Sequence, residues 1–403
     1  MIPEFHVVRT AITPRAASLL LASLVALASA CNRPDAAATD VVRTDSSNVR
    51  IVLSTAADRD LPWTFEQVEV MRDSAGEPWL FNGLHHRGVL ADRAGRVYVV
   101  TRDPSIVRFG REGRHDRTIG RKGGGPGEMQ YPSDIGAQVD TLFVRDIVKG
   151  ALVRWSSALE PVNDVRLDGA FAGAEAIAFR SGGFWLQKKL YSDTLITNAL
   201  FADTVGGAAL HSTSLRPSGM IDFGCVKLSG LAPVFAPNLI WTANGPRVVI
   251  NATAAYEIWM HEGARVTASV RRAVPTRAPS AADVDSVYAG GFRVEFGSGS
   301  PPCIVPAEQM AAKLGVAEKM PLINDMQYLS DGTIWVQRSL RGAAEPVLDV
   351  FIADGSYAGT MRGMDLPLGL MPNGDILFAR DDEDTGGVHM VRMKVIKRPP
   401  ASP

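Results

Sequence analysis

The sequence has little of what identifies several large classes of protein. Its 403 residues carry 42 Lys and Arg against 43 Asp and Glu, so it lacks the basic excess with which nucleic-acid binders displace counterions. It holds only 3 Cys, too few for a disulfide scaffold. No apolar run reaches the roughly 18 residues that suggest a membrane-spanning helix. The 38 Gly and 25 Pro, about 16% of the chain, instead indicate many turns.

Residues 1–30 have the pattern of an export signal. Arg9 and Arg15 give a positive start, and residues 16–30 form an uncharged run rich in Ala and Leu. At 1.5 Å per residue, a helix of this run would fall short of a hydrocarbon core about 30 Å thick. The run therefore fits the apolar part of a signal peptide better than a membrane span.

Cys31 directly follows the small residues Ala-Ser-Ala. This junction resembles the bacterial lipobox, which implies that Cys31 is lipidated and that the protein is a lipoprotein with the membrane as a partner. Asn32 in place of Asp implies sorting to the outer membrane. The alternative is ordinary cleavage nearby, with Cys31 incidental. Residues 31–49 are small, polar and without periodicity, so we expect a flexible tether there.

A short polar turn followed by a strand of alternating apolar residues recurs along the chain. The clearest copies are 92–99, 330–336 and 372–378, and weaker copies are 139–144, 180–186 and 244–250. Turns near 95, 140, 182, 245, 332 and 374 give spacings of 45, 42, 63, 87 and 42 residues. A unit of 42–45 residues has the size of one four-stranded propeller blade, and the two long spacings leave room for insertions.

The repeats predict an all-β fold: a six-bladed β-propeller over residues 50–398, with four-stranded antiparallel blades and a short tail at 399–403. One short inserted helix is expected at 306–315, because Pro306 opens it and Gly315 closes it. We expect the strand at 63–71 to close the ring by pairing with the C-terminal strand at 391–397.

Residues 120–132 read Gly-Arg-Lys-Gly-Gly-Gly-Pro-Gly-Glu-Met-Gln-Tyr-Pro. This segment resembles the G-x-G-P-G-E-F-x-x-P junction of bacterial six-bladed β-propeller lipoproteins, relatives of NHL-repeat and TolB-like propellers. Met129 stands where the family has Phe. The resemblance implies a fold and a cell-envelope location rather than one settled activity. Read from the residues, the run is a tight turn, or a cradle for an anion formed by Arg121, Lys122 and the backbone near Gly124.

In a propeller the residues that precede each innermost strand gather at one mouth of the central channel. The expected register places eight polar residues there: His85, His86, Arg87, Ser133, Asp134, Glu175, Asn324 and Asp325. Of these, His86, Asp134, Glu175, Asn324 and Asp325 are candidate ligands for a divalent cation such as Ca²⁺. The alternative is that they are solvated loop residues, because a one-residue slip turns every side chain to the other face.

Cys225 and Cys303 remain once Cys31 is set aside. In an exported chain they either form a disulfide or are two separate buried thiols.

No Gly-x-Ser-x-Gly elbow or His-Glu-x-x-His helix is present. The sequence therefore favours a non-enzymatic binding or scaffold module for a protein, peptide or glycan ligand. The alternative is a metal-dependent hydrolase or lyase, similar to six-bladed lactonases, with its site at the channel mouth.

Overall fold

The computed structural model of the chain describes residues 41–44, 49–55, 57–71, 84–101, 103–167, 174–180, 183–192, 195–202, 208–215, 218–287, 291–294, 301–339, 345–381 and 388–397. The predicted signal peptide, Cys31 and the predicted tail all lie outside these residues. Within them, no helix is both long and apolar enough to cross a membrane.

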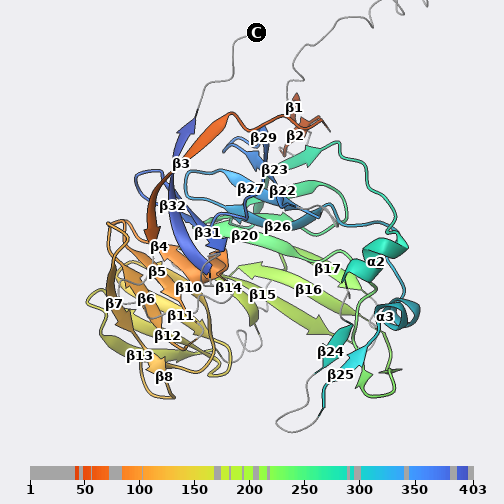
Figure 1. Ribbon diagram of the computed structural model, residues 1–403, viewed down its shortest axis with the longest axis horizontal. Helices are drawn as coiled ribbons and strands as arrows, with labels where there is room; N and C mark the ends of the chain where they lie inside the picture. The colour runs from red at the N-terminus through yellow and green to blue at the C-terminus, as the bar shows by residue number, and fades with distance from the viewer. Residues whose placement is uncertain are drawn as a thin grey trace, which may run out of the picture. The chain divides into compact units, whose positions relative to one another are not determined.

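Six antiparallel blades form a ring around a central channel, as predicted (Figure 1). Blade 1 has strands β4 (Val89–Ala91), β5 (Val97–Val100), β6 (Ile106–Phe109) and β7 (His115–Ile119). Blade 2 has β10 (Pro132–Gln138), β11 (Thr141–Asp146), β12 (Ala151–Ser156) and β13 (Pro161–Arg166). Blade 3 has β14 (Ala174–Arg180), β15 (Gly183–Tyr191), β16 (Ile196–Ala202) and β17 (His211–Leu215).

The second half of the ring follows the same order from the channel outward. Blade 4 has β20 (Ile240–Asn244), β21 (Arg247–Asn251), β22 (Glu257–Glu262) and β23 (Arg265–Arg272). Blade 5 has β26 (Ile323–Tyr328), β27 (Ile334–Arg338), β28 (Val347–Phe351) and β29 (Tyr357–Arg362). Blade 6 has β30 (Gly369–Leu370), β31 (Ile376–Asp381), β32 (Val388–Lys397) and, outermost, β3 (Trp63–Met71).

The three clearest repeats of the sequence make the same hairpin. Gly95, Gly332 and Gly374 have φ of 77°, 85° and 89°, which favours glycine because a Cβ would be strained there. In the first hairpin the amide of Gly95 donates to the carbonyl of Asp92, and the amide of Asp92 donates to the carbonyl of Arg96. The same two hydrogen bonds recur in the hairpins of Gly332 and Gly374. The polar turn with glycine at a fixed place therefore sets where the first strand of a blade ends and the second begins.

Each pair of neighbouring blades encloses its own apolar cluster, and the six clusters together account for all six interfaces of the ring. Trp155, Trp185 and Trp335 are almost fully buried in three of them. A single blade exposes both of its faces, so burial of these side chains depends on neighbours on each side.

The ring is closed by the predicted pairing of β3 with β32, which is antiparallel and runs from Trp63 opposite Lys397 to Met71 opposite Met390. The residues before β3 also belong to the sheet structure. Strand β2 (Arg50–Ser54) lies parallel to β23 at the outer edge of blade 4, and β1 (Val41–Thr44) pairs with β2. The end of the segment predicted as a tether therefore contains a paired strand.

Between β2 and β3 the chain crosses the outer edge of blade 5. The amide of Leu61 donates to the carbonyl of Thr360 (2.9 Å), and the amide of Thr360 donates to the carbonyl of Arg59 (2.7 Å). We call residues 50–71 the N-terminal belt, because they join the outer edges of blades 4, 5 and 6 in turn. Hydrophobic alternation indicated only its last strand, since parallel pairing with β23 involves residues more than 200 positions away.

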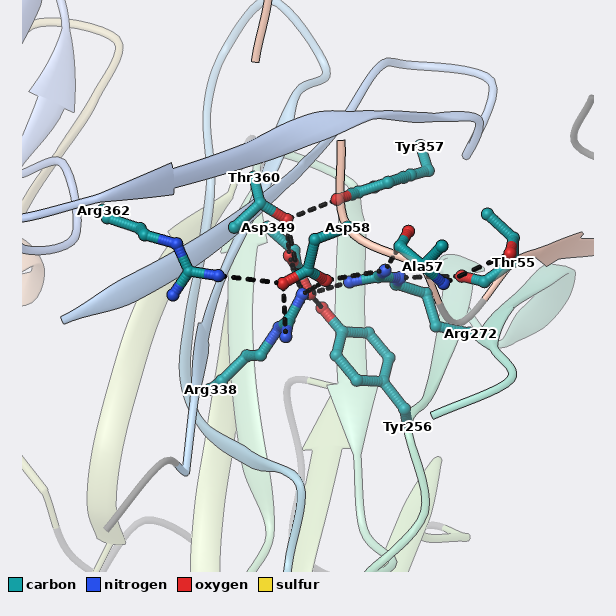
Figure 2. A network of polar contacts seen from close by, with 10 residues as sticks. All are labelled: Thr55, Ala57, Asp58, Tyr256, Arg272, Arg338, Asp349, Tyr357, Thr360 and Arg362. Atoms are coloured by element: carbon teal, nitrogen blue, oxygen red, sulfur yellow. Dashed lines mark hydrogen bonds and ion pairs between the residues drawn. The ribbon is translucent and has the colours of Figure 1, made fainter. Parts of the chain in front are cut away.

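A buried polar network fixes the belt to blades 4 and 5 (Figure 2). The carboxylate of Asp349 accepts hydrogen bonds from Arg272 Nη1 (2.7 Å), Arg338 Nε (2.8 Å) and the Tyr256 hydroxyl (2.7 Å). Burial alone would raise the pKa of Asp349, but the two guanidinium groups hold it below its ordinary value. Asp58 of the belt accepts from the same two arginines.

The two insertions fold together into one small layer. The first contains β18 (Ile221–Asp222) and β19 (Lys227–Leu228); the second contains α2 (Ala281–Val287), β24 (Phe292–Val294), β25 (Cys303–Val305) and α3 (Ala307–Leu314). Cys225 and Cys303, left open by the sequence, form a disulfide with a Cα–Cα distance of 5.7 Å. Helix α3 matches the predicted helix, but α2 was missed, although its Ser280-Ala-Ala-Asp283 start is a capping pattern.

Replacement of Asp349 by Ala should destabilise the fold strongly, because it leaves Arg272 and Arg338 buried with half of their anionic partners removed. We expect a loss of about 3–5 kcal/mol in the free energy of unfolding, measured by urea denaturation. Glu262→Ala is the control: Glu262 pairs with Arg265 at the surface and should cost less than about 1 kcal/mol. Equal losses in the two variants would contradict this role of the network.

Candidate functional site

The central channel contains a cavity of about 260 Å³. All six innermost strands or the residues beside them line it, including His86 and Arg87 before β4, Trp241 of β20 and Gln327 of β26. The lining combines apolar and polar side chains, as is common in ligand sites. Because the first strands of all blades run in the same direction along the channel, the segments before them meet at one mouth.

Arg87 is the cation that the mouth presents to the channel. It belongs to a short 3₁₀ helix, η1 (His86–Gly88), and its guanidinium lies 4.5 Å from the centre of the Trp241 ring. Its Nη2 also donates to the carbonyl of Trp241 (2.9 Å). Burial lowers the pKa of Arg87, against the opposite effects of the nearby Asp134 and Asp325 carboxylates. No carboxylate of the described residues lies within 4.0 Å of Arg87, so its charge is held in place without an ion-pair partner.

The Asp134 carboxylate forms an ion pair with a second arginine, Arg145. Arg145 of β11 bonds the Asp134 carboxylate through Nη1 (2.9 Å), and both side chains are buried. The same guanidinium donates to the carbonyls of Ala174 and Glu175 in blade 3. The amide of Ile177 also donates to Asp134 (3.3 Å). This ion pair joins blades 2 and 3 and leaves Asp134 with little capacity for a further ligand.

Asp325 and His86 face each other across the mouth, with 4.0 Å between Asp325 Oδ2 and His86 Nδ1. Burial lowers the pKa of His86 to about 3, and nearby Arg87 and His85 act in the same direction, so the ring is neutral at pH 7. Burial also raises the pKa of Asp325, against the opposite effects of the Met326 amide and Arg87. The nearby Asp134 and Asp325 carboxylates favour the charged form of His85, but burial outweighs them and lowers the pKa of His85.

Glu175 and Asn324 are paired with residues of their own blades rather than with the other candidate ligands. Glu175 forms an ion pair with Lys189 (2.8 Å), and Asn324 donates to Gln337 (3.0 Å). Both residues lie where their strand slips register against its neighbour, as do Ser133 and Asp134. A bulge re-aims the side chains around it, and a regular strand pattern read from sequence does not reveal it.

The five candidate cation ligands therefore do not form one set. Among the described residues, no group of three or more His, Cys, Asp or Glu side chains is close enough to hold a metal ion. The structure brings together His85, His86, Arg87, Asp134 and Asp325, with Arg145 and Trp241 as members that the sequence interpretation missed. A charged residue at the end of the apolar run Leu142–Val144 was the available signal for Arg145, and a tryptophan beside the Asn-Gly turn was the signal for Trp241.

The glycine-rich turn supplies its own anion. It lies between β8 (Arg121–Lys122) and β9 (Glu128–Met129), and the Glu128 carboxylate accepts from the amide of Gly125 (2.8 Å) and from Arg121 (2.8 Å). The amide of Gly125 and then Arg121 lower the pKa of Glu128. Glu128 therefore occupies the position that the sequence predicts for an external anion, beside Arg121, Lys122 and Gly124.

The neutral state of His86 predicts a loss of stability in acid. Its pKa is 6.5 when unperturbed and about 3 in the fold, so between these values the unfolded chain binds more protons and stability falls as pH falls. The loss between pH 7 and pH 4 should be smaller in His86→Gln than in the unchanged protein, by up to about 3 kcal/mol in urea denaturation. His115→Gln, at an exposed position of β7, is the control. An unaltered acid loss in His86→Gln would show that His86 does not carry it.

Comparison with known proteins supports the fold of this chain but identifies no family or activity. No family model and no curated protein matches the sequence. A protein of Bacteroides fragilis described as exported is similar in structure, with 10% identity, coverage of 86% of this chain and 100% of that chain, and a TM-score of 0.52. More distant similarities include a luciferin-regenerating enzyme (9% identity, 82% and 95% coverage, TM-score 0.37) and BamB of Moraxella catarrhalis (11%, 76% and 81%, TM-score 0.30). At 10% identity the likeness to the exported protein concerns the fold alone.

Proposed function

We propose that this chain is a binding module of the bacterial cell envelope that takes an anionic group of a protein, peptide or glycan ligand at its channel mouth. The observation that carries the proposal is the cation Arg87, which no carboxylate of the described residues approaches within 4.0 Å and which is fixed over Trp241 at the entrance to a cavity that all six blades line. A guanidinium held in this way loses little conformational freedom when it binds a carboxylate. The rigid ring holds the site, since each inner strand is fixed by the blades beside it.

The remaining charges at the mouth favour recognition over metal-assisted hydrolysis. A catalytic metal needs several oxygen or nitrogen ligands that are free to bind it. Asp134 and Glu175 are instead paired with Arg145 and Lys189, and Asn324 is turned toward Gln337. No observation on the described residues specifically favours the hydrolase or lyase alternative.

The sequence supports the proposed location in the cell envelope. The signal-like run at 16–30 and the lipobox-like junction at Cys31 support export and attachment of the module to a lipid membrane. Asn32 supports the outer membrane as the place of attachment. A multiply acylated N-terminus would anchor the protein stably, because each buried CH₂ group contributes about 0.8 kcal/mol.

The role of Arg87 predicts a preference for acidic ligands. We would measure the binding of peptide pairs that differ only by Glu or Gln, and of oligosaccharide pairs that differ only by a uronate or its neutral sugar, by calorimetry. At least one acidic member should bind about 10- to 100-fold more tightly than its neutral twin, because a charge-assisted hydrogen bond contributes about 1.5–3 kcal/mol. Arg87→Gln should abolish this preference.

Arg93→Gln is the matched control, because Arg93 is an exposed arginine of the first hairpin in the same blade. This variant should keep the acidic preference. If acidic and neutral members bind equally well, or if Arg87→Gln retains the preference, the mouth is not an anion-binding site.

Lipid attachment has a separate test. Cells that express the full chain are labelled with a palmitate analogue, and the protein is isolated and its label measured. Cys31→Ala should lose the label and leave the membrane fraction, because no other residue is expected to carry the anchor. Equal labelling of the two proteins would refute lipidation at Cys31.

A further inference from the structure

A second cavity, of about 430 Å³, lies between the insertion layer and blades 4 and 5. Its described lining residues are all different from those of the channel cavity. Its volume falls within the roughly 300–1,000 Å³ of typical small-molecule sites. This cavity is thus separate from the channel, and no sequence motif indicates it.

The roof of this cavity is apolar and firmly built. Met310 and Leu314 of α3, with Phe292 of β24, cover it from the second insertion. The first insertion crosses beside them, and Val234 both donates its amide to Gly315 (3.0 Å) and accepts from the amide of Ala317 (2.9 Å). The Cys225–Cys303 disulfide joins the two insertions, so the roof is preformed rather than assembled by a ligand.

The floor is polar but uncharged. Three amide side chains line it: Asn238 before β20, Asn251 at the end of β21, and Asn324 of β26. Their hydrogen bonds fix their orientation. Asn251 donates to the carbonyls of Ala255 (3.1 Å) and Glu257 (2.8 Å), and Asn238 accepts from Asn198 (3.0 Å). Thr253 and Ser339 add hydroxyl groups to the lining.

Among the described residues that line the cavity, none has a charged side chain. An ionised ligand would lose hydration there without gaining a partner of opposite charge, which is costly. An uncharged ligand would bury its apolar body against the roof and place a hydrogen-bonding group near the fixed amides of the floor.

From this arrangement we propose that the cavity under the insertion layer binds an uncharged small molecule with an apolar body and one or two hydrogen-bonding groups. The site is independent of the proposed function, since an anionic ligand at Arg87 and a neutral ligand under the layer would contact different residues. The chain would then recognise two ligands of different chemistry on one ring.

The probe for this site is N-phenyl-1-naphthylamine, a neutral fluorophore with two apolar ring systems and one N–H group. Its sulfonated analogue, 1-anilinonaphthalene-8-sulfonate, has the same rings and a negative charge. We expect the neutral probe to bind the full chain saturably with one molecule per chain, and the sulfonate to bind at least tenfold more weakly. Absence of saturable neutral-probe binding, or tighter binding of the sulfonate, would overturn the proposal.

Two variants locate the probe. Leu314→Trp and Thr253→Trp place a larger side chain into the cavity from its roof and its floor, and each should weaken binding at least tenfold. Leu195→Trp is the matched control, because Leu195 is exposed in blade 3 and lies outside the lining; it should bind as the unchanged protein does. Thermal denaturation confirms that each variant is folded.

The pattern across variants separates this site from the channel. If Arg87→Gln abolishes probe binding while both cavity-filling variants retain it, the probe occupies the channel and the proposal is wrong. If the cavity-filling variants lose the probe but keep the acidic-ligand preference, the second site stands on its own, whatever the outcome at Arg87.

Discussion

The structure depends on closure of the ring. A single blade can bury neither face by itself, and each of the six apolar clusters lies between two neighbouring blades. Blade 6 is completed by a strand from the other end of the chain, β3 beside β32. The belt reinforces this closure at blades 4 and 5, where Asp349 and Asp58 share two arginines. Without the belt, the outer edges of blades 4, 5 and 6 would lack the strand or segment that pairs with them.

Rigid closure also determines how charge is used at the mouth. Most charged groups there serve the ring: Arg145 and Asp134 join blades 2 and 3, and Lys189 pairs with Glu175 within blade 3. Arg87 differs because an aromatic ring and a backbone carbonyl, rather than a carboxylate, hold it. Two arginines that look alike in sequence therefore differ in their contacts: Arg145 joins two blades through Asp134, and Arg87 is the residue to which we assign the proposed binding role.

The fold could be predicted because its signals are local. Turn glycines such as Gly332 and the alternating strands that follow them need only a few neighbouring residues to be recognised, and their spacing gave the six blades. The belt and the joined insertions depend on partners far away in sequence, such as β2 with β23, and leave no local pattern. For the channel mouth, the sequence identified the segments that meet there. It did not identify which side chains meet, because bulges near Asp134, Glu175 and Asn324 determine this.

The belt also has a consequence for how the chain acquires its fold. Residues 63–71 are synthesised long before their partner strand, Val388–Lys397, which follows them by more than 300 residues. Contacts between such distant segments form slowly, because a long loop must close before any interaction is gained. Blades 1 to 5 can assemble in chain order, but β3 lacks its antiparallel partner until residues 388–397 have been synthesised. Closure of the ring is therefore a late event in folding, whatever the order in which the other blades form.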